Sequence, residues 1–307
     1  MLTRFQYYKN YIIIFSIFLS SILSKNQYDS LIGNYSITNT SETIYNQEIS
    51  FVINDQLEFL NNIFGSINKL PFKFIIFNDN SSSIQYYHWK WSNGITIKDK
   101  IIIKDPKISH ISINYFYTVI RHEINHLFLN RVNTNISIPR WFNEGFAMYY
   151  ANQQNLNYKM TIAKNINNEQ LFNIYYLNKK FHSDLKYEFD FAYAYSNILF
   201  HEIINLYGEE SILKIVQNIR DGNNFQHSFY LSTLDSLTSF NRDIYSRIKS
   251  KYRWYNLIRF PNLILIFSPL ILIVSFYIKR KRNKIKIKEW EIEEELLEEN
   301  SYDNEKE

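Results

Sequence analysis

Two histidines and a glutamate lie close together at His122, Glu123 and His126, in the pattern His-Glu-x-x-His. Residues 114–130 around them carry apolar side chains at helical spacing, which predicts a helix with one buried face. Positions i and i+4 of a helix lie on the same face, about 6 Å apart along the axis. The two imidazoles can therefore bind one metal ion. Glu123 projects to the side, where it can reach a water molecule on that metal without being a ligand.

A catalytic zinc site has three protein ligands and leaves a fourth position for water. Glu144 follows His126 by 18 residues, in the apolar segment 139–147 (PRWFNEGFA), where a second helix is expected. An antiparallel helix after a turn returns the chain to the inner face of the first helix. We therefore predict that His122, His126 and Glu144 bind one Zn2+ ion, with Glu123 as the general base.

Residues 122–126, together with the sequence WFNEGFA at 141–147, resemble the gluzincin class of metallopeptidases. More specifically, they resemble the peptidase-MA-like family of bacterial membrane or exported proteins. It continues in the sequences AYAYS at 192–196 and LYG at 206–208, and it covers roughly residues 85–250.

The resemblance implies a zincin-like catalytic domain that hydrolyses peptide bonds. In that family the two histidines and the downstream glutamate bind zinc, and the glutamate of the motif, here Glu123, is the base. Some gluzincins stabilise the oxyanion with a tyrosine from a later helix, which makes Tyr193 the first candidate here and Tyr195 the second. Asn143 is a candidate for orienting an imidazole from behind.

Upstream of the motif the sequence predicts a mixed α/β region. Residues 49–63 have helical spacing, residues 72–77 (FKFIIF) are a short run of β-formers, and residues 95–104 have the pattern of one or two strands. Asn93-Gly94 indicates a turn. Because extended peptides commonly add to the edge of a sheet, the strand region 95–104 is a candidate edge for a peptide substrate.

Downstream of the motif the pattern becomes helical. Further helices are expected at residues 140–153, 191–207, 211–219 and 235–257. We therefore expect an α+β fold. A small N-terminal mixed sheet (residues 26–105) would pack on a mainly helical catalytic part (residues 106–257), and both would belong to one peptidase domain.

The N-terminal residues 1–25 have the character of a targeting segment. Arg4 and Lys9 precede an apolar run of 13 residues at 11–23, the length typical of the hydrophobic part of a signal peptide. Serines at the end of the run offer small residues for cleavage. The segment is therefore interpreted as a signal peptide or, if it is not cleaved, as an N-terminal anchor.

A second apolar segment lies near the C-terminus. Residues 260–278 carry no charge and are long enough to cross a lipid bilayer, so we predict a transmembrane helix at 258–278. Seven of the ten residues at 279–288 are Lys or Arg, which predicts a cytoplasmic tail at 279–307, basic and then acidic. The catalytic part would then be extracytoplasmic in a single-pass membrane protein.

Composition excludes several other classes. The net charge of the 307 residues is only +4 and is unevenly placed, which argues against a nucleic-acid partner. The absence of cysteine excludes disulfides, thiolate zinc sites and a cysteine nucleophile. The leading interpretation is a membrane-anchored zinc metallopeptidase that acts on protein or peptide substrates. The alternatives are an inactive binding or scaffold protein of the cell envelope on the same fold, and a metallohydrolase acting on a non-peptide bond.

Overall fold

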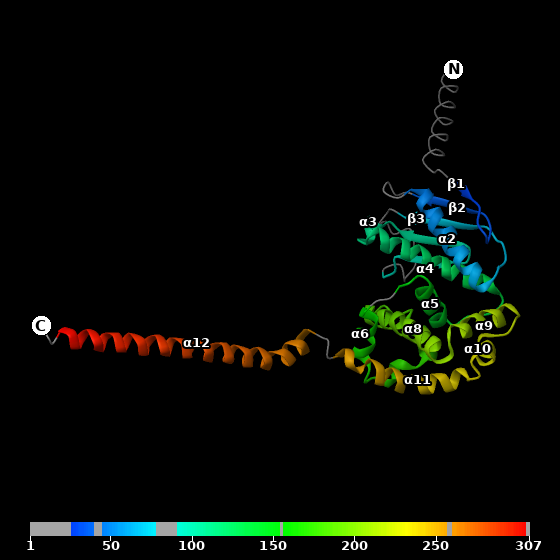
Figure 1. Cartoon of the computed structure of the whole chain (residues 1–307). Coiled ribbons are helices and arrows are strands. Elements are labelled where there is room, and N and C mark those ends of the chain that lie inside the picture. The colour runs from blue at the N-terminus through cyan, green and yellow to red at the C-terminus, as the bar shows by residue number, and fades with distance from the viewer. Residues whose placement is uncertain (1–25, 40–44, 78–90, 154–155, 257–259, 305–307) are drawn as a thin grey trace, which may run out of the picture. The chain divides into compact units, whose positions relative to one another are not determined.

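The computed structural model describes most of the 307 residues (Figure 1). The described ranges are 26–39, 45–77, 91–153, 156–256 and 260–304. The predicted signal peptide or anchor at residues 1–25 lies outside them. Contacts divide the chain into two compact units, Met1–Tyr252 and Arg253–Glu307.

The first unit contains a mixed five-stranded sheet in the order β1-β2-β3-β5-β4. The strands are β1 (Asn26–Tyr28), β2 (Tyr35–Asn39), β3 (Phe72–Phe77), β4 (Gly94–Ile97) and β5 (Lys100–Lys104). The inner pairs β2–β3 and β3–β5 are parallel, whereas β1–β2 and β4–β5 are antiparallel. Among the described residues, β4 therefore lies at one edge of the sheet.

Two helices pack together beside this sheet, α2 (Asn46–Phe64) and α4 (Ile113–Val132) (Figure 1). Helix α4 also contacts β4 and β5, so it lies next to the edge strand. Arg131 anchors the last turn of α4 and is only 3% exposed. That side chain pairs with Asp99 and donates to the backbone oxygens of Ile32, Leu70 and Pro71. These bonds fix the end of α4 against the loops at one end of the sheet.

Helices make up the rest of the first unit. The longer ones are α5 (Arg140–Tyr150), α6 (Leu156–Asn165), α8 (Lys186–Tyr207), α9 (Glu209–Arg220), α10 (Phe225–Thr233) and α11 (Leu237–Tyr252). Shorter turns are α3 (Pro106–Ser109), η2 (Glu169–Phe172), η3 (Ile174–Tyr176) and α7 (Leu177–Lys180). A small mixed sheet on a mainly helical body confirms the α+β fold class expected from the sequence.

Helix α5 is held from two sides. The fully buried Asn125 of α4 accepts a bond from Gln56 of α2 (2.7 Å) and donates to the backbone oxygen of Ala147 on α5 (2.9 Å). On the other side Gly145 lets α8 approach closely, because a Cβ there would lie 2.7 Å from Cβ of Phe200 and 2.8 Å from the backbone oxygen of Ser196. The position of α5 relative to α4 is therefore fixed by packing and by buried amide bonds.

Two sequence predictions need correction in this unit. Gly94 is the first residue of β4 and not part of a turn; the tight turn of the β4–β5 hairpin lies at Lys98 and Asp99, where Lys98 has φ of 50°. Helix α8 begins at Lys186, five residues before the predicted start, because its polar first turn carries no apolar periodicity that could mark it.

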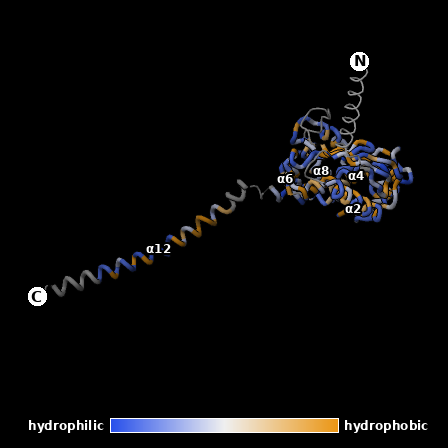
Figure 2. Tube along the Cα trace, turned by 90° about the horizontal axis from the view of Figure 1, so that it is seen from above, coloured by the Kyte–Doolittle hydropathy of each residue, from blue (hydrophilic) through white to orange (hydrophobic). Residues whose placement is uncertain are grey.

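The second unit consists of η4 (Arg253–Asn256) and the long helix α12 (Phe260–Asn304). Figure 2 shows a hydrophobic stretch on this helix followed by a mainly hydrophilic one. Side chains at 256–266 and 296–304 lie outside the described part. Over the described residues, none of the helices is both long and apolar enough to cross a bilayer. The span predicted at 258–278 stays a prediction.

Candidate metal centre

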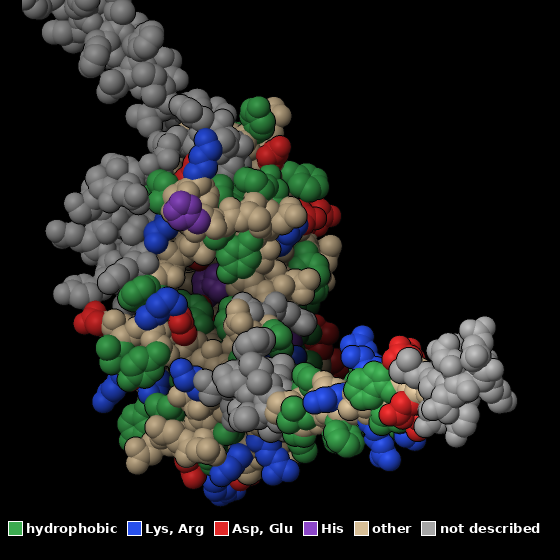
Figure 3. Space-filling model, turned by 90° about the vertical axis from the view of Figure 1, so that its left-hand side faces the viewer, with side chains coloured by type: hydrophobic (Ala, Val, Ile, Leu, Met, Phe, Trp, Pro, Cys, Tyr) green, Lys and Arg blue, Asp and Glu red, His purple; other side chains and the backbone are tan. Residues whose placement is uncertain are grey.

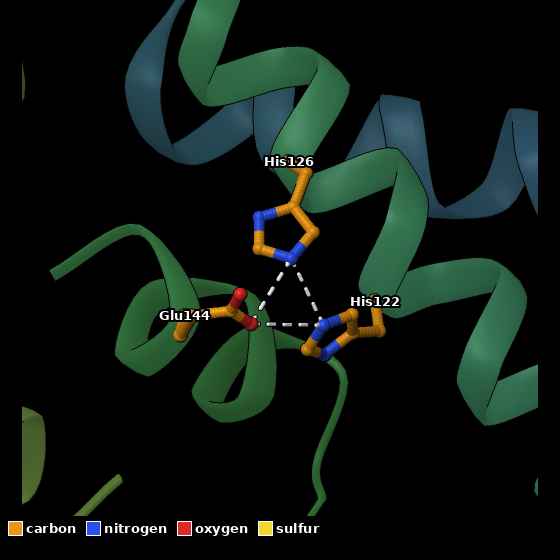
Figure 4. Close-up of side chains that lie close together, drawn as sticks. All are labelled: His122, His126 and Glu144. Carbon is orange, nitrogen blue, oxygen red and sulfur yellow. Dashed lines mark hydrogen bonds and ion pairs between the residues drawn. The ribbon is translucent and has the colours of Figure 1, made fainter. Parts of the chain in front are cut away.

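The three predicted ligands come together at one point (Figure 4). His122 and His126 lie one turn apart on α4, and Glu144 reaches them from α5. The Nε2 atoms of the two histidines are 3.0 Å apart. Oε2 of Glu144 lies 3.5 Å from Nε2 of His122 and 3.3 Å from Nε2 of His126.

This triangle has the dimensions of a metal site. Three ligand atoms bound tetrahedrally to one zinc ion at about 2.0–2.1 Å lie about 3.3 Å from one another. The buried Oε2 of Glu144 makes no hydrogen bond to any described group, and its nearest printed partners are the two histidine Nε2 atoms, so it is an unsatisfied acceptor at the triangle. Two imidazoles and one carboxylate are a donor set that zinc accepts. The residues present therefore fit a zinc ion.

Electrostatics at the triangle favour a bound positive charge. Burial opposes protonation of His126, but Glu144, Glu123 and Asn143 together outweigh burial and raise the pKa of His126 to about 9. Burial also opposes ionisation of Glu144, yet His126, His122 and Arg140 hold its pKa well below the ordinary value. Without a metal, the carboxylate is thus balanced by a proton on His126. A divalent cation can take the place of that proton.

The ring of His126 is oriented by a hydrogen bond at Nδ1, the nitrogen that faces away from the triangle. Its Nδ1 lies 2.7 Å from Oδ1 of Asn143, and Nδ2 of Asn143 donates to Oδ1 of Asn130 at 2.7 Å. Because the amide nitrogen of Asn143 is engaged elsewhere, its oxygen faces the ring and accepts the Nδ1 proton. In the neutral ring, the free lone pair is therefore on Nε2, which faces the triangle.

Glu123 lies beside the triangle and against the edge strand. Oγ1 of Thr96 donates to its Oε2 at 2.6 Å. A Cβ at Gly94 would lie 2.7 Å from Oε1 of Glu123, so the carboxylate fits only because residue 94 is a glycine. The sequence analysis did not identify Gly94 or Thr96 as site residues. Their role depends on the packing of β4 against α4, which no local pattern records.

The two candidate tyrosines on α8 have different surroundings. Tyr193 lines a cavity of about 260 Å³ together with all three ligands and Glu123. Burial, and next the Glu144 carboxylate, raise the pKa of Tyr193 well above its ordinary value. Tyr195 is fully buried and donates to the backbone oxygen of Phe172 at 2.6 Å. The structure therefore brings Tyr193 to the site and places Tyr195 in the core.

Arg140 is a further group at this cavity that the sequence analysis missed. Its Nε lies 3.3 Å from Oε1 of Glu144, and its positive charge acts on Tyr193 across the same cavity. The spacing of Arg140 and Glu144, i and i+4 on one helix, is the sequence signal that could have identified it.

A larger cavity of about 360 Å³ opens on the other side of Glu123. Its walls come from the segment before β4, from α4, from α6 and from the first turns of α8. Figure 3 shows a hollow on this face with a histidine side chain at its base. His122, Glu123 and Tyr193 line both cavities, so the candidate centre lies where they meet.

The sequence is similar to one family of known proteins. The family model of the Peptidase MA superfamily matches residues 53–243, more than half of the chain, including the three ligands and Glu123. No curated protein matches the sequence.

Among solved structures, there is a match to a crystal structure of a substitution mutant of M1 zinc metallopeptidase from Deinococcus radiodurans, bound to a Tyr-Ser-Ala substrate. The sequence identity is 12% and the TM-score is 0.38; the match covers 76% of this chain and 51% of that one. This chain thus spans about half the length of that structure. It is the family model, matched across the sheet edge, the metal triangle and the helices behind it, that shows the chain to belong to the Peptidase MA superfamily.

Proposed function

We propose that this chain is a zinc-dependent peptidase of the gluzincin type, with His122, His126 and Glu144 as ligands and Glu123 as the general base. The observation that carries the proposal is the triangle of ligand atoms, 3.0–3.5 Å on each side, with a second carboxylate beside it. Membership of a peptidase superfamily supports the same reading.

A zinc ion bound at the triangle would lower the pKa of a water molecule and polarise the substrate carbonyl. Glu123 accepts the proton of the attacking water and then passes it to the leaving amine. The bond from Thr96 to Oε2 keeps the Glu123 carboxylate in one orientation between these two transfers. General acid–base catalysis of this kind contributes about 10²- to 10⁴-fold to the rate.

Tyr193 is the proposed donor to the negative charge that develops on the carbonyl oxygen. Burial and the charge of Glu144 keep the pKa of Tyr193 well above its ordinary value, so the hydroxyl retains its proton at neutral pH. A protonated hydroxyl in a buried cavity donates a hydrogen bond without ionising. Tyr195 has no such role, because its hydroxyl is engaged in the core.

The edge strand β4 is the proposed support for an extended peptide. It pairs with β5 along one side and packs against α4, directly next to Glu123. A peptide added along the edge of β4 would pass the carboxylate of Glu123 and the metal triangle.

The larger cavity offers room for a side chain next to the scissile bond. Val119, Tyr158 and Phe189 contribute apolar or aromatic walls. Among its described lining residues, Lys186 and Asp190 pair with each other at 2.7 Å, which leaves Glu123 as the remaining formal negative charge. The volume and the aromatic walls suit a bulky side chain, and polar lining groups such as Asn157 and Thr161 offer it hydrogen bonds.

Hydrolysis of a quenched fluorescent peptide library by the full-length protein tests this proposal. Glu123→Gln should keep zinc and lose about 10²- to 10⁴-fold in kcat, because the ligands are intact and the base is gone. Equal activity in Glu123→Gln and the unaltered protein would contradict it. Zinc binding with no hydrolysis of any peptide would instead favour the binding or scaffold role.

Location outside the cytoplasm is a separate proposal, supported by the sequence of the two apolar segments and the basic run at 279–288. The natural absence of cysteine allows a clean test. In intact cells, Ser250→Cys should react with a membrane-impermeant maleimide and Ser301→Cys should not. The reverse pattern, or equal labelling only after lysis, would contradict it.

A further inference from the structure

Arg140 lines the cavity of about 260 Å³ that holds the three candidate ligands. Among the described charged residues of that cavity, it is the one without a role in the proposed hydrolysis. It lies in the first turn of α5, and its side chain is 28% exposed, whereas that of Glu144 is only 6% exposed. Its Nε approaches Oε1 of Glu144 at 3.3 Å, the carboxylate oxygen that does not face the histidines. Oε2 is thereby left to the metal triangle.

The same guanidinium reaches a second helix. Its central carbon lies 4.6 Å from the centre of the Phe181 ring, and its positive charge acts on Tyr193 of α8, which lines the same cavity. The Phe181 ring in turn packs edge-on against Tyr193, with ring centres 5.4 Å apart. Arginine can serve two acceptors at once, because its donors are arranged on a rigid planar fork; the ammonium of lysine is a single point charge on a flexible stem.

Arg131 shows how a purely structural arginine differs in this protein. It is 3% exposed, and its partners are Asp99 and three backbone oxygens at the end of the sheet. Arg140 binds no backbone oxygen in any described contact. Its ion-pair partner is a proposed metal ligand, and the proposed oxyanion donor lines the same cavity.

We propose that Arg140 is a positioning residue that couples the third metal ligand to Tyr193: it restricts Glu144 to binding through one oxygen and orients the Tyr193 hydroxyl. The part concerning Tyr193 rests on the proposed peptidase function. The part concerning Glu144 rests only on metal binding.

Three variants of the full-length protein separate these two parts. Arg140→Ala removes both contacts, Arg140→Lys keeps a positive charge for Glu144 but not the fork, and Tyr193→Phe removes the hydroxyl alone. Arg121→Ala is the matched control, since Arg121 also pairs with a carboxylate, Asp55 at 3.5 Å, and directly precedes His122 in the chain. The readouts are zinc affinity by competition with a chelator, the absorption spectrum of bound Co2+, and kcat and KM on one fluorescent peptide.

Arg140→Ala should weaken zinc binding by about 10- to 100-fold and change the Co2+ spectrum, as the Glu144 carboxylate becomes free to offer both oxygens. Arg140→Lys should keep zinc affinity within about threefold but lower kcat by about 10- to 100-fold with little change in KM. Arg121→Ala should match the unaltered protein in all readouts.

A double-mutant cycle tests the coupling directly. If Arg140 acts through Tyr193, adding Arg140→Lys to Tyr193→Phe should cost less than about threefold more in kcat. Losses that multiply would overturn the coupling to Tyr193. An unchanged Co2+ spectrum and zinc affinity in Arg140→Ala would overturn the role at Glu144. If the unaltered protein hydrolyses nothing, the peptidase function and the Tyr193 part both fail, while the metal readouts still decide the Glu144 part.

Discussion

The ring of His126 connects metal binding to pH. Burial lowers the pKa of this ring, but Glu144, Glu123 and Asn143 together outweigh burial and raise it to about 9 in the absence of metal. A zinc ion can bind Nε2 only after the proton has left, so protons compete with zinc below pH 9. Zinc affinity should therefore rise with pH, by about tenfold per unit between pH 7 and 9, and level off above that. Competition with a chelator of known pH dependence measures this slope; an affinity that falls as pH rises would contradict it.

Gly94 and Glu123 form a contact that leaves no room for a side chain. In Gly94→Ala the new Cβ would lie 2.7 Å from Oε1 of Glu123, so the carboxylate has to move from its bond with Thr96. We expect kcat to fall by about 100-fold, within the range for general-base catalysis, while zinc content stays at one ion per chain. Elemental analysis and kcat, measured on the same preparation, check this. Unchanged kcat would show that the Glu123 carboxylate does not need this position.

At the residue scale, the metal ligands and the general base could be predicted from the sequence. The residues that hold Glu123 in position could not. His122, Glu123 and His126 stand in one recognisable pattern, and Glu144 is a carboxylate in an apolar stretch at the right distance along the chain. Thr96 and Gly94 gain their roles only when an edge strand packs against a helix that begins 19 residues after Gly94. That pairing is a tertiary event with no local signal.

Among the elements, those with a strong hydrophobic period were the predictable ones. Strand β3 has the predicted bounds, and α2 and α4 extend the predicted helices by only a few residues. The short strands β1 and β2 were missed. β1 has three residues and β2 has five, so neither is long enough to show an alternation distinct from a loop.

The cavity between α4, α6 and α8 should set the preference for the substrate side chain. Val119 is 5% exposed and lines this cavity one helical turn before Glu123. Val119→Phe should fill the space and lower kcat/KM for a peptide with Phe next to the scissile bond by about 10- to 100-fold more than for the same peptide with Ala. Val119→Ala should favour the bulky peptide instead. Equal effects on both peptides would show that substrate does not enter this cavity.

For the whole molecule, the candidate centre lies entirely within the unit Met1–Tyr252. Its ligands come from α4 and α5, which also belong to the core of that unit, so metal binding should stabilise the fold. Zinc at about 1,000 times its dissociation constant stabilises a native state by about 4 kcal/mol. For a unit of this size the melting temperature should fall by about 10 °C when a chelator removes the metal. Calorimetry with and without zinc measures this, and an identical melting temperature would contradict it.

The change from a mixed sheet to helices along the first unit was predictable from sequence, whereas the predicted membrane span stays a prediction. A mixed sheet followed by helices is encoded in the change of hydrophobic period along the chain. Residues 260–278 carry no charged side chain, and this apolar composition is as clear a sequence signal as the hydrophobic periods of the first unit. No helix among the described residues reaches the length and apolarity needed for a span.

The central claim is that one zinc ion is bound by two imidazoles of α4 and one carboxylate of α5. The most direct test is the zinc content and affinity of the full-length protein beside His126→Ala, Glu144→Ala and Glu123→Gln. The account predicts one zinc per chain in the unaltered protein and in Glu123→Gln, with affinity lower by at least about 100-fold when either ligand is removed. A protein that binds no zinc, or a Glu144→Ala variant that binds it as tightly as before, would contradict the account.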